Sequence, residues 1–137
     1  MRSETDVLIL RPLQKNETAI GGSCSLSAEV FDYGNKEGCF AVVSKESRKI
    51  VGTVICPEEE IRVYITESNR DLGYGADALN LALDALFGML GRKAVTAFCE
   101  ADDVPSVKTL EHCGFERVSD EHSMISWRLT AEQWEVL

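Results

Sequence analysis

The sequence predicts a single α/β domain, in which a mixed, mostly antiparallel sheet of six to seven strands is flanked by helices. The chain has 137 residues, which is enough for one hydrophobic core and no more. Short apolar runs of strand length recur along it. One longer stretch of helical period, residues 76–90, interrupts them and follows a glycine-containing loop. Alternation of this kind is typical of a sheet with helices packed against it.

The first half of the chain is mainly extended. Residues 7–13 form a strand whose pairing should end at Pro12, because proline lacks the N–H that a ladder needs. The β-branched runs 39–44 and 50–56 flank a short polar stretch and predict a hairpin. A further strand, residues 61–65, leads into the glycine loop. Residues 14–37 carry no clear pattern.

The long helix should end at Gly91, where a residue without Cβ closes a helix easily. Its apolar positions recur at steps of three and four residues from Ala76 to Leu90. Residues 94–99 follow. Because they are apolar on both faces of a strand, they predict an inner strand with layers on each side.

A second, shorter helix should begin after Asp103, whose carboxylate can accept from the free first-turn amides. Pro105 falls in that first turn, where a missing N–H costs nothing. Gly114 would end the helix. Residues 115–118 and 124–129 then predict a closing hairpin, and Thr130 begins a capping box with the residue three positions later.

Composition and charge exclude several functions. The net charge is −9, and a duplex-binding surface needs clustered Lys and Arg, so nucleic acid is not expected as a partner. The cysteine count is odd, no C-x-x-C pair occurs, and the two histidines are not at metal-ligand spacing. We therefore expect buried free thiols, no metal site, and a reducing compartment, the cytoplasm. No apolar run approaches the length of a membrane span, and no signal peptide precedes the first strand.

The glycine loop at the start of the long helix is a candidate anion site. The first amides of a helix have no internal partner, and glycine lets a ligand approach the main chain closely. No Gly-Lys-Ser/Thr follows, so this is not a nucleotide-triphosphatase phosphate loop. The dinucleotide fingerprint fits poorly, since Ala78 stands where its third glycine is expected. A strand-to-helix turn that binds nothing stays open as the alternative.

Two motifs in order carry a family resemblance. The first is Arg70-Asp71-Leu72-Gly73-Tyr74-Gly75, and the second runs from Asp103 to Phe115 as DVPSVKTLEHCGF, with strand 94–99 between them. Together they resemble the acetyl-CoA loop and the "N-x-x-S-x-x-x-L-E-x-x-G-F" segment of the GNAT superfamily of N-acetyltransferases. The likeness covers residues 39–129, and strand 7–13 before them. It implies one acetyl-CoA-dependent domain over residues 1–137, with residues 14–37 as a short acceptor-side segment.

The resemblance also implies where coenzyme A would bind. The sheet of such proteins is splayed between the fourth and fifth strands, here 61–65 and 94–99, and the pantetheine arm pairs with the fourth as an added β-partner. The pyrophosphate would lie on the amides at the start of the long helix, and Asp103 and Ser106 would border the cofactor from the second helix. The implied cofactor contacts are Val63, Tyr64, Ile65, Arg70, Asp71, Leu72, Gly73, Tyr74, Gly75, Ala76, Asp103 and Ser106.

Within the superfamily, the likeness leans to the RimJ/RimL-like group, the ribosomal-protein N-terminal acetyltransferase type. Many other members place a tyrosine acid where Leu110 stands here. The RimL-like group instead places a serine where Ser106 stands, and its hydroxyl would stabilise or protonate the departing thiolate. Glu60 matches a glutamate that would take the amine's proton through a water. The alternatives stay open: Ser106 as an ordinary first-turn residue, and Glu60 as part of a solvated turn.

Two departures from the family pattern leave other functions open. Asp71 stands where glycine is usual, and Asp103 replaces the usual asparagine, so two carboxylates lie near the expected phosphates. The favoured function is direct acetyl transfer from acetyl-CoA to a primary amine, either a small molecule or a peptide. The alternatives are a degenerate module that binds acyl-CoA without turnover, and an adaptor that binds a protein partner. The pattern leaves open a homodimer that completes the pocket.

Overall fold

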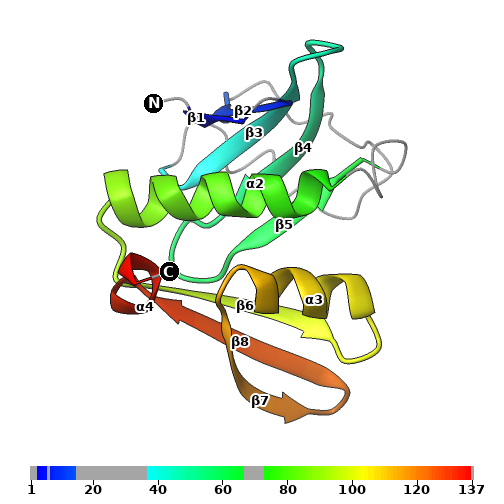
Figure 1. The fold of residues 1–137 in the computed structure, drawn as a ribbon, viewed down its shortest axis with the longest axis vertical. Helices are drawn as coiled ribbons and strands as arrows, with labels where there is room; N and C mark the ends of the chain where they lie inside the picture. Colours follow the sequence, from blue (N-terminus) through cyan, green and yellow to red (C-terminus); the bar gives the residue numbers. More distant parts are fainter. Residues whose placement is uncertain (1–2, 6, 15–36, 67–72, 137) are drawn as a thin grey trace.

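The structure, a computed structural model, describes residues 3–5, 7–14, 37–66 and 73–136. Within these ranges the chain forms two antiparallel sheets, and helices α2 and α3 lie over the same side of them (Figure 1). No helix among these residues is long and apolar enough to cross a membrane. The elements are β1 (Ser3–Glu4), β2 (Leu8–Pro12), β3 (Cys39–Ser44), β4 (Ile50–Ile55), β5 (Arg62–Ile65), α2 (Tyr74–Leu83), η2 (Asp84–Met89), β6 (Ala94–Glu100), α3 (Val104–His112), β7 (Glu116–Glu121), β8 (Met124–Thr130) and α4 (Ala131–Glu135).

The two sheets confirm the predicted α/β class with a mostly antiparallel arrangement. The larger sheet has the order β1-β2-β3-β4-β5, and the smaller has the order β6-β8-β7. The expected hairpin 39–44/50–56 is β3–β4, where Phe40 pairs with Val54. The short strand β1 brings the number of described strands one above the six to seven expected.

The sheets meet at one point, which confirms the predicted splay between the strands 61–65 and 94–99. The Ile61 N–H donates to the Thr96 carbonyl over 2.8 Å, and the Thr96 N–H donates to the Glu59 carbonyl over 2.9 Å. A single parallel bridge joins Glu60 to Thr96. Beyond it, β5 and β6 belong to different sheets, so the two strands diverge.

One core connects the sheets through the long helix. Buried apolar side chains extend from Leu8 in β2 through Leu83 and Leu86 to Trp127 and Leu129 in β8. The apolar positions predicted from helical period and from strand alternation therefore pack into one core. A smaller cluster on the opposite face of the first sheet includes Leu13 and Ile55.

The long helix changes pitch halfway, which sequence periodicity did not predict. Residues 74–83 are α-helical, but residues 84–89 are π-helical, and the Leu90 N–H donates to the carbonyl of Ala85 five positions earlier. The predicted end at Gly91 is confirmed, since its φ is 67° and the Arg92 N–H donates back to Leu86.

The prediction that residues 94–99 are covered on both faces is wrong. In β6 burial alternates: Val95, Ala97 and Cys99 are buried, whereas Phe98 is 53% exposed. One face of β6 therefore carries the core, and the face that bears Phe98 does not. Apolar side chains such as Phe98 made the exposed face look buried in the sequence.

The C-terminal predictions are confirmed in detail. The Asp103 carboxylate accepts from the Ser106 N–H over 3.3 Å at the start of α3. Gly114 ends that helix with a φ of 93°, and the Phe115 N–H donates to the Leu110 carbonyl. Thr130 and its partner three positions on form a capping box in which both reciprocal bonds are present.

A prediction for stability arises at Gly52 in β4. A Cβ there would collide with the carbonyl oxygen of Tyr64 and lie 2.8 Å from Cδ1 of Ile65. We expect Gly52→Ala to lower the free energy of unfolding by about 1–3 kcal/mol, because backbone must move to admit the methyl group. Chemical denaturation measures this. Gly88→Ala is the control, since its Cβ would meet its nearest neighbour, Trp134, at an ordinary 3.6 Å; equal losses in both variants would contradict the steric argument.

The described cysteines are free and buried, as predicted: Cys39, Cys56, Cys99 and Cys113. Cys24 lies outside the described residues. Burial raises the pKa of Cys113 to about 11. Burial also raises the pKa of Cys56 to about 11, although the nearby Arg92 guanidinium acts in the opposite direction.

These thiols predict a loss of stability at high pH. In the unfolded chain they ionise near pH 9.0, whereas in the fold they hold their protons to about pH 11. The stability due to the neutral thiols is therefore fully present below pH 9.0 and is lost as pH rises toward about 11. Denaturant unfolding across this range measures the fall. It should be shallower in Cys113→Ala, and an equally steep fall in that variant would contradict the assignment.

Candidate active site

No described residue occupies the space at the mouth of α2 around Gly73 and Gly75. Gly73 is the N-cap residue, with φ 79° and ψ 4°, and no side chain caps the helix there. A Cβ built at Gly73 or Gly75 would meet nothing within 4 Å among the described residues. The space at the helix N-terminus is thus unfilled by the described part of the chain, and first-turn amides without helical partners face it.

This geometry fits the pyrophosphate of coenzyme A. A phosphate needs close approach to main-chain donors, which side chains at these two positions would block. The predicted contacts Tyr74 and Ala76 lie in the first turn and are half-buried. Asp77, also in that turn, adds one carboxylate near the helix start. The predicted contacts Arg70, Asp71 and Leu72 lie outside the described residues, so their roles stay predictions.

The predicted pantetheine strand borders the divergence of the sheets. β5 is the end strand of its sheet, and β6 begins the other. Along it, Val63 is 36% exposed, Tyr64 is half-buried and Ile65 is buried. Helices α2 and α3 both begin on the right in Figure 1, and α2 packs against β5. The mouth of α2 and the start of α3 therefore face the same side of the molecule in this view.

Ser106 is bonded to Asp103, which the sequence did not reveal. Its Oγ donates to Oδ2 of Asp103 over 2.7 Å, while Oδ1 of the same carboxylate accepts the Ser106 N–H. Asp103 thus caps α3 and also holds the hydroxyl proton of Ser106. A hydroxyl held in this way must turn away from Asp103 before it can donate to a thiolate.

Glu60 lies at the point where the sheets meet, in the bridge with Thr96. Its Oε2 accepts from Nε of Arg62 over 3.2 Å, and the two side chains are 43% and 41% exposed. An exposed ion pair of this kind is weak and exchanges readily with water. Glu60 thus lies where β5 and β6 diverge, and its exposure fits the predicted solvated turn as well as a base.

Arg92, the residue after Gly91, links the end of the long helix to a distant turn. Its guanidinium donates to the carbonyl of Glu58 and lies 3.8 Å from Sγ of Cys56. The side chain thereby ties the end of the long helix to the turn that leads to Glu60. The cation after Gly91 was visible in the sequence, but its distant partner was not.

His112 is the last residue of α3 and is exposed. Ser106 lies in the first turn of the same helix, so the two side chains belong to opposite ends. The residues described include no group of three or more His, Cys, Asp or Glu side chains that could hold a metal ion.

Comparisons with solved structures show the same fold. An acetyltransferase of the GNAT family from Bacillus anthracis is 16% identical, with a TM-score of 0.75, and the match covers 96% of this chain and 99% of that one. A ribosomal-protein-S5-alanine acetyltransferase from Vibrio fischeri is 13% identical, with a TM-score of 0.76 and 98% of each chain covered. The spermidine/spermine N-acetyltransferase SpeG from Vibrio cholerae is 16% identical, with a TM-score of 0.79 and coverage of 95% and 96%.

Sequence comparison assigns the chain to a family, which structural similarity at such low identity does not. No curated protein matches it in sequence. The family model for the acetyltransferase (GNAT) domain, however, matches residues 11–116, which include the glycine loop, both strands at the splay and all of α3. The chain therefore belongs to the GNAT acetyltransferase family.

Proposed function

We propose that this protein is an acetyl-CoA-dependent N-acetyltransferase that acetylates a primary amine by direct attack. The observation that carries the proposal is the space that the described residues leave at Gly73 and Gly75, at the start of the helix that follows β5. A bound acetyl-CoA would supply the acetyl group as a reactive thioester. The amides at the start of α2 would hold its diphosphate, and β5 would hold its pantetheine arm.

The protein's own residues would then position the acceptor and move its proton. Much of the rate gain of such a transfer comes from holding the amine nitrogen against the acetyl carbon. Glu60, once released from Arg62, would take the amine proton through a water. The Ser106 hydroxyl, once turned from Asp103, would donate to the sulfur as the carbon–sulfur bond breaks. Buried free thiols fit the reducing cytoplasm.

The acceptor class is a primary amine on a small molecule or on a peptide N-terminus. Structural neighbours of both kinds support this range, because one is named for spermidine and spermine and another for the alanine of a ribosomal protein. Membership in the RimJ/RimL-like group belongs to this proposal and rests on Ser106 and Leu110 standing where that group's pattern has them. The homodimer that the sequence leaves open remains untested.

The second candidate, a module that binds acyl-CoA without turnover, is favoured by the Asp103–Ser106 bond, because the proposed acid donates to a carboxylate. One experiment separates the two. Acetyl-CoA consumption is followed with a thiol reagent against a panel of small amines and N-terminal peptides, and coenzyme A affinity is measured by calorimetry. Turnover with any amine supports the enzyme, and tight binding without turnover supports the module. If the protein shows neither turnover nor thermal stabilisation by coenzyme A, the remaining function is the adaptor that binds a protein partner.

Glu60 gives a specific prediction for this mechanism. We expect Glu60→Gln to lower kcat about 10–100-fold, because the amide cannot accept the proton, while KM for acetyl-CoA changes little. The matched control is Glu58→Gln, an exposed carboxylate two residues away that should leave kcat unchanged. Initial rates at saturating acetyl-CoA measure both variants. Equal effects of the two substitutions would place Glu60 in the solvated turn.

A further inference from the structure

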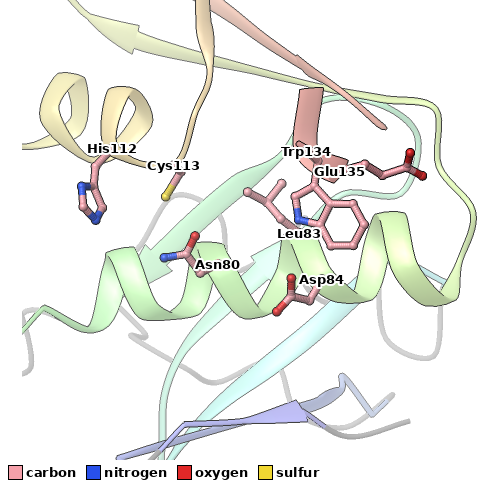
Figure 2. Close-up of a pocket in the computed structure, with 7 residues that line it drawn as sticks. All are labelled: Asn80, Leu83, Asp84, His112, Cys113, Trp134 and Glu135. Carbon is pink, nitrogen blue, oxygen red and sulfur yellow. The ribbon is translucent and has the colours of Figure 1, made fainter. Parts of the chain in front are cut away.

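A second concave site lies away from the mouth of α2. It is formed between the outer side of α2, the C-terminal end of α3 and the terminal helix α4, and its volume is about 450 Å³ (Figure 2). His112, the last residue of α3, lies at one end, and Glu135, the last residue of α4, lies at the other. Because Ser106 is in the first turn of α3, this pocket is separate from the proposed reaction site.

The charge of the pocket favours a cation. Asp84 from the π-helical segment and Glu135 from α4 contribute two exposed carboxylates, and neither Lys nor Arg lines the pocket. The C-terminal end of α3 also points its partial negative charge toward this region. The amide of Asn80 adds a hydrogen-bonding group. These groups would repel an anion, and so would the net charge of −9 on the whole chain.

The aromatic wall favours an organic cation over a bare ion. The Trp134 indole stacks on Phe87, with the ring centroids 5.5 Å apart and the planes at 30°, so the ring is held in place. Phe87 is buried, whereas Trp134 keeps surface that lines the pocket. Figure 2 shows the indole between the side chains of Asp84 and Glu135. An indole face attracts an ammonium through its quadrupole and an alkyl chain through apolar contact.

We propose that this pocket is an accessory binding site for a small organic cation, a primary alkylammonium whose charge is attracted by the Asp84 and Glu135 carboxylates and whose chain lies on Trp134. A divalent metal is not the ligand that this geometry selects, since the described residues include no converging group of three or more ligating side chains. The site is distinct from the acetyl-transfer chemistry, and its occupancy requires no acyl-CoA.

The test uses n-butylammonium as the probe and n-butanol as its neutral analogue, at constant ionic strength. The chain has two tryptophans, so incorporation of 5-fluorotryptophan gives two ¹⁹F signals. Trp134 reports on the pocket, and Trp127, which is 1% exposed in the core, is the internal reference. We expect n-butylammonium to shift the Trp134 signal in a saturable manner and to leave the Trp127 signal in place. n-Butanol should shift Trp134 much less.

Charge variants decide the outcome. The double variant Asp84→Asn/Glu135→Gln should weaken n-butylammonium binding by about tenfold or more, since both charge partners are lost. Glu132→Gln is the matched control, because Glu132 is an exposed carboxylate of the same helix that does not line the pocket. An absent shift, an equal response to n-butanol, or unchanged binding in the double variant would overturn the proposal. None of these outcomes bears on acetyl transfer, which is assayed separately.

Discussion

Gly75→Val should abolish measurable coenzyme A binding while leaving the fold intact. No described atom lies within 4 Å of the Cβ position at Gly75, so a side chain can start there without a clash, and valine is no worse than glycine in a helix. The same side chain would occupy the space in which the diphosphate approaches the amides. Loss of two charge-assisted hydrogen bonds lowers affinity by roughly 100-fold or more. Calorimetry with coenzyme A measures the affinity, and thermal unfolding measures the fold.

The controls for this prediction come from the same helix. Gly75→Ala adds only a methyl group and should retain part of the affinity. Gly88→Ala changes a glycine of the π-helical segment, far along the helix from its mouth, and should retain all of it. Gly73 is a poorer test site, because its φ of 79° would strain any side chain there. Unchanged affinity in Gly75→Val would remove the phosphate from the mouth of α2, and with it the observation that carries the proposed function.

The fold was predictable because local signals and burial agree over most of the chain. The cap at Asp103, the glycine end at Gly114 and the hairpin β7–β8 each depend on neighbouring residues, which sequence displays directly. The π-helical turns are different, since side-chain period cannot distinguish them within so short a segment. The exposed face of β6 was not predictable, because Phe98, an exposed apolar side chain, carries the same signal in the sequence as a buried one.

The site was predictable only in its outline. Motif order singled out Ser106 and the glycine loop as candidates, but two contacts of the candidate residues and their neighbours were not visible in the sequence. The Ser106–Asp103 bond depends on rotamers at the helix start, and the contact from Arg92 to Glu58 joins residues 34 positions apart. The pocket at Trp134 depends on how α4 packs against α2, which is a tertiary contact without a local signal.

Ser106→Ala should lower kcat by about 100-fold and change the KM for acetyl-CoA little. The hydroxyl is the proposed donor to the sulfur, and loss of a general acid typically costs that much. Its N–H stays bonded to Asp103, so the helix cap survives the substitution. Steady-state rates at saturating amine give the split between kcat and KM. An unchanged kcat would reduce Ser106 to a residue of the first helical turn.

Asp103→Asn then tests whether the carboxylate restrains that hydroxyl. Asparagine caps a helix as well as aspartate does, so α3 should remain. The hydroxyl loses a charged acceptor 2.7 Å away. We therefore expect kcat to rise several-fold, which corresponds to a fall of about 1 kcal/mol in the activation free energy. Removal of the exposed charge should also lower KM for acetyl-CoA, by about threefold.

Two controls separate these effects. When Asp103→Asn is made in the Ser106→Ala background, the gain in kcat must vanish while the change in KM persists, since only the gain in kcat acts through Ser106. Asp102→Asn, a neighbouring exposed carboxylate, controls for net charge. A gain in kcat that survives without Ser106 would show that Asp103 acts on the reaction by its charge alone.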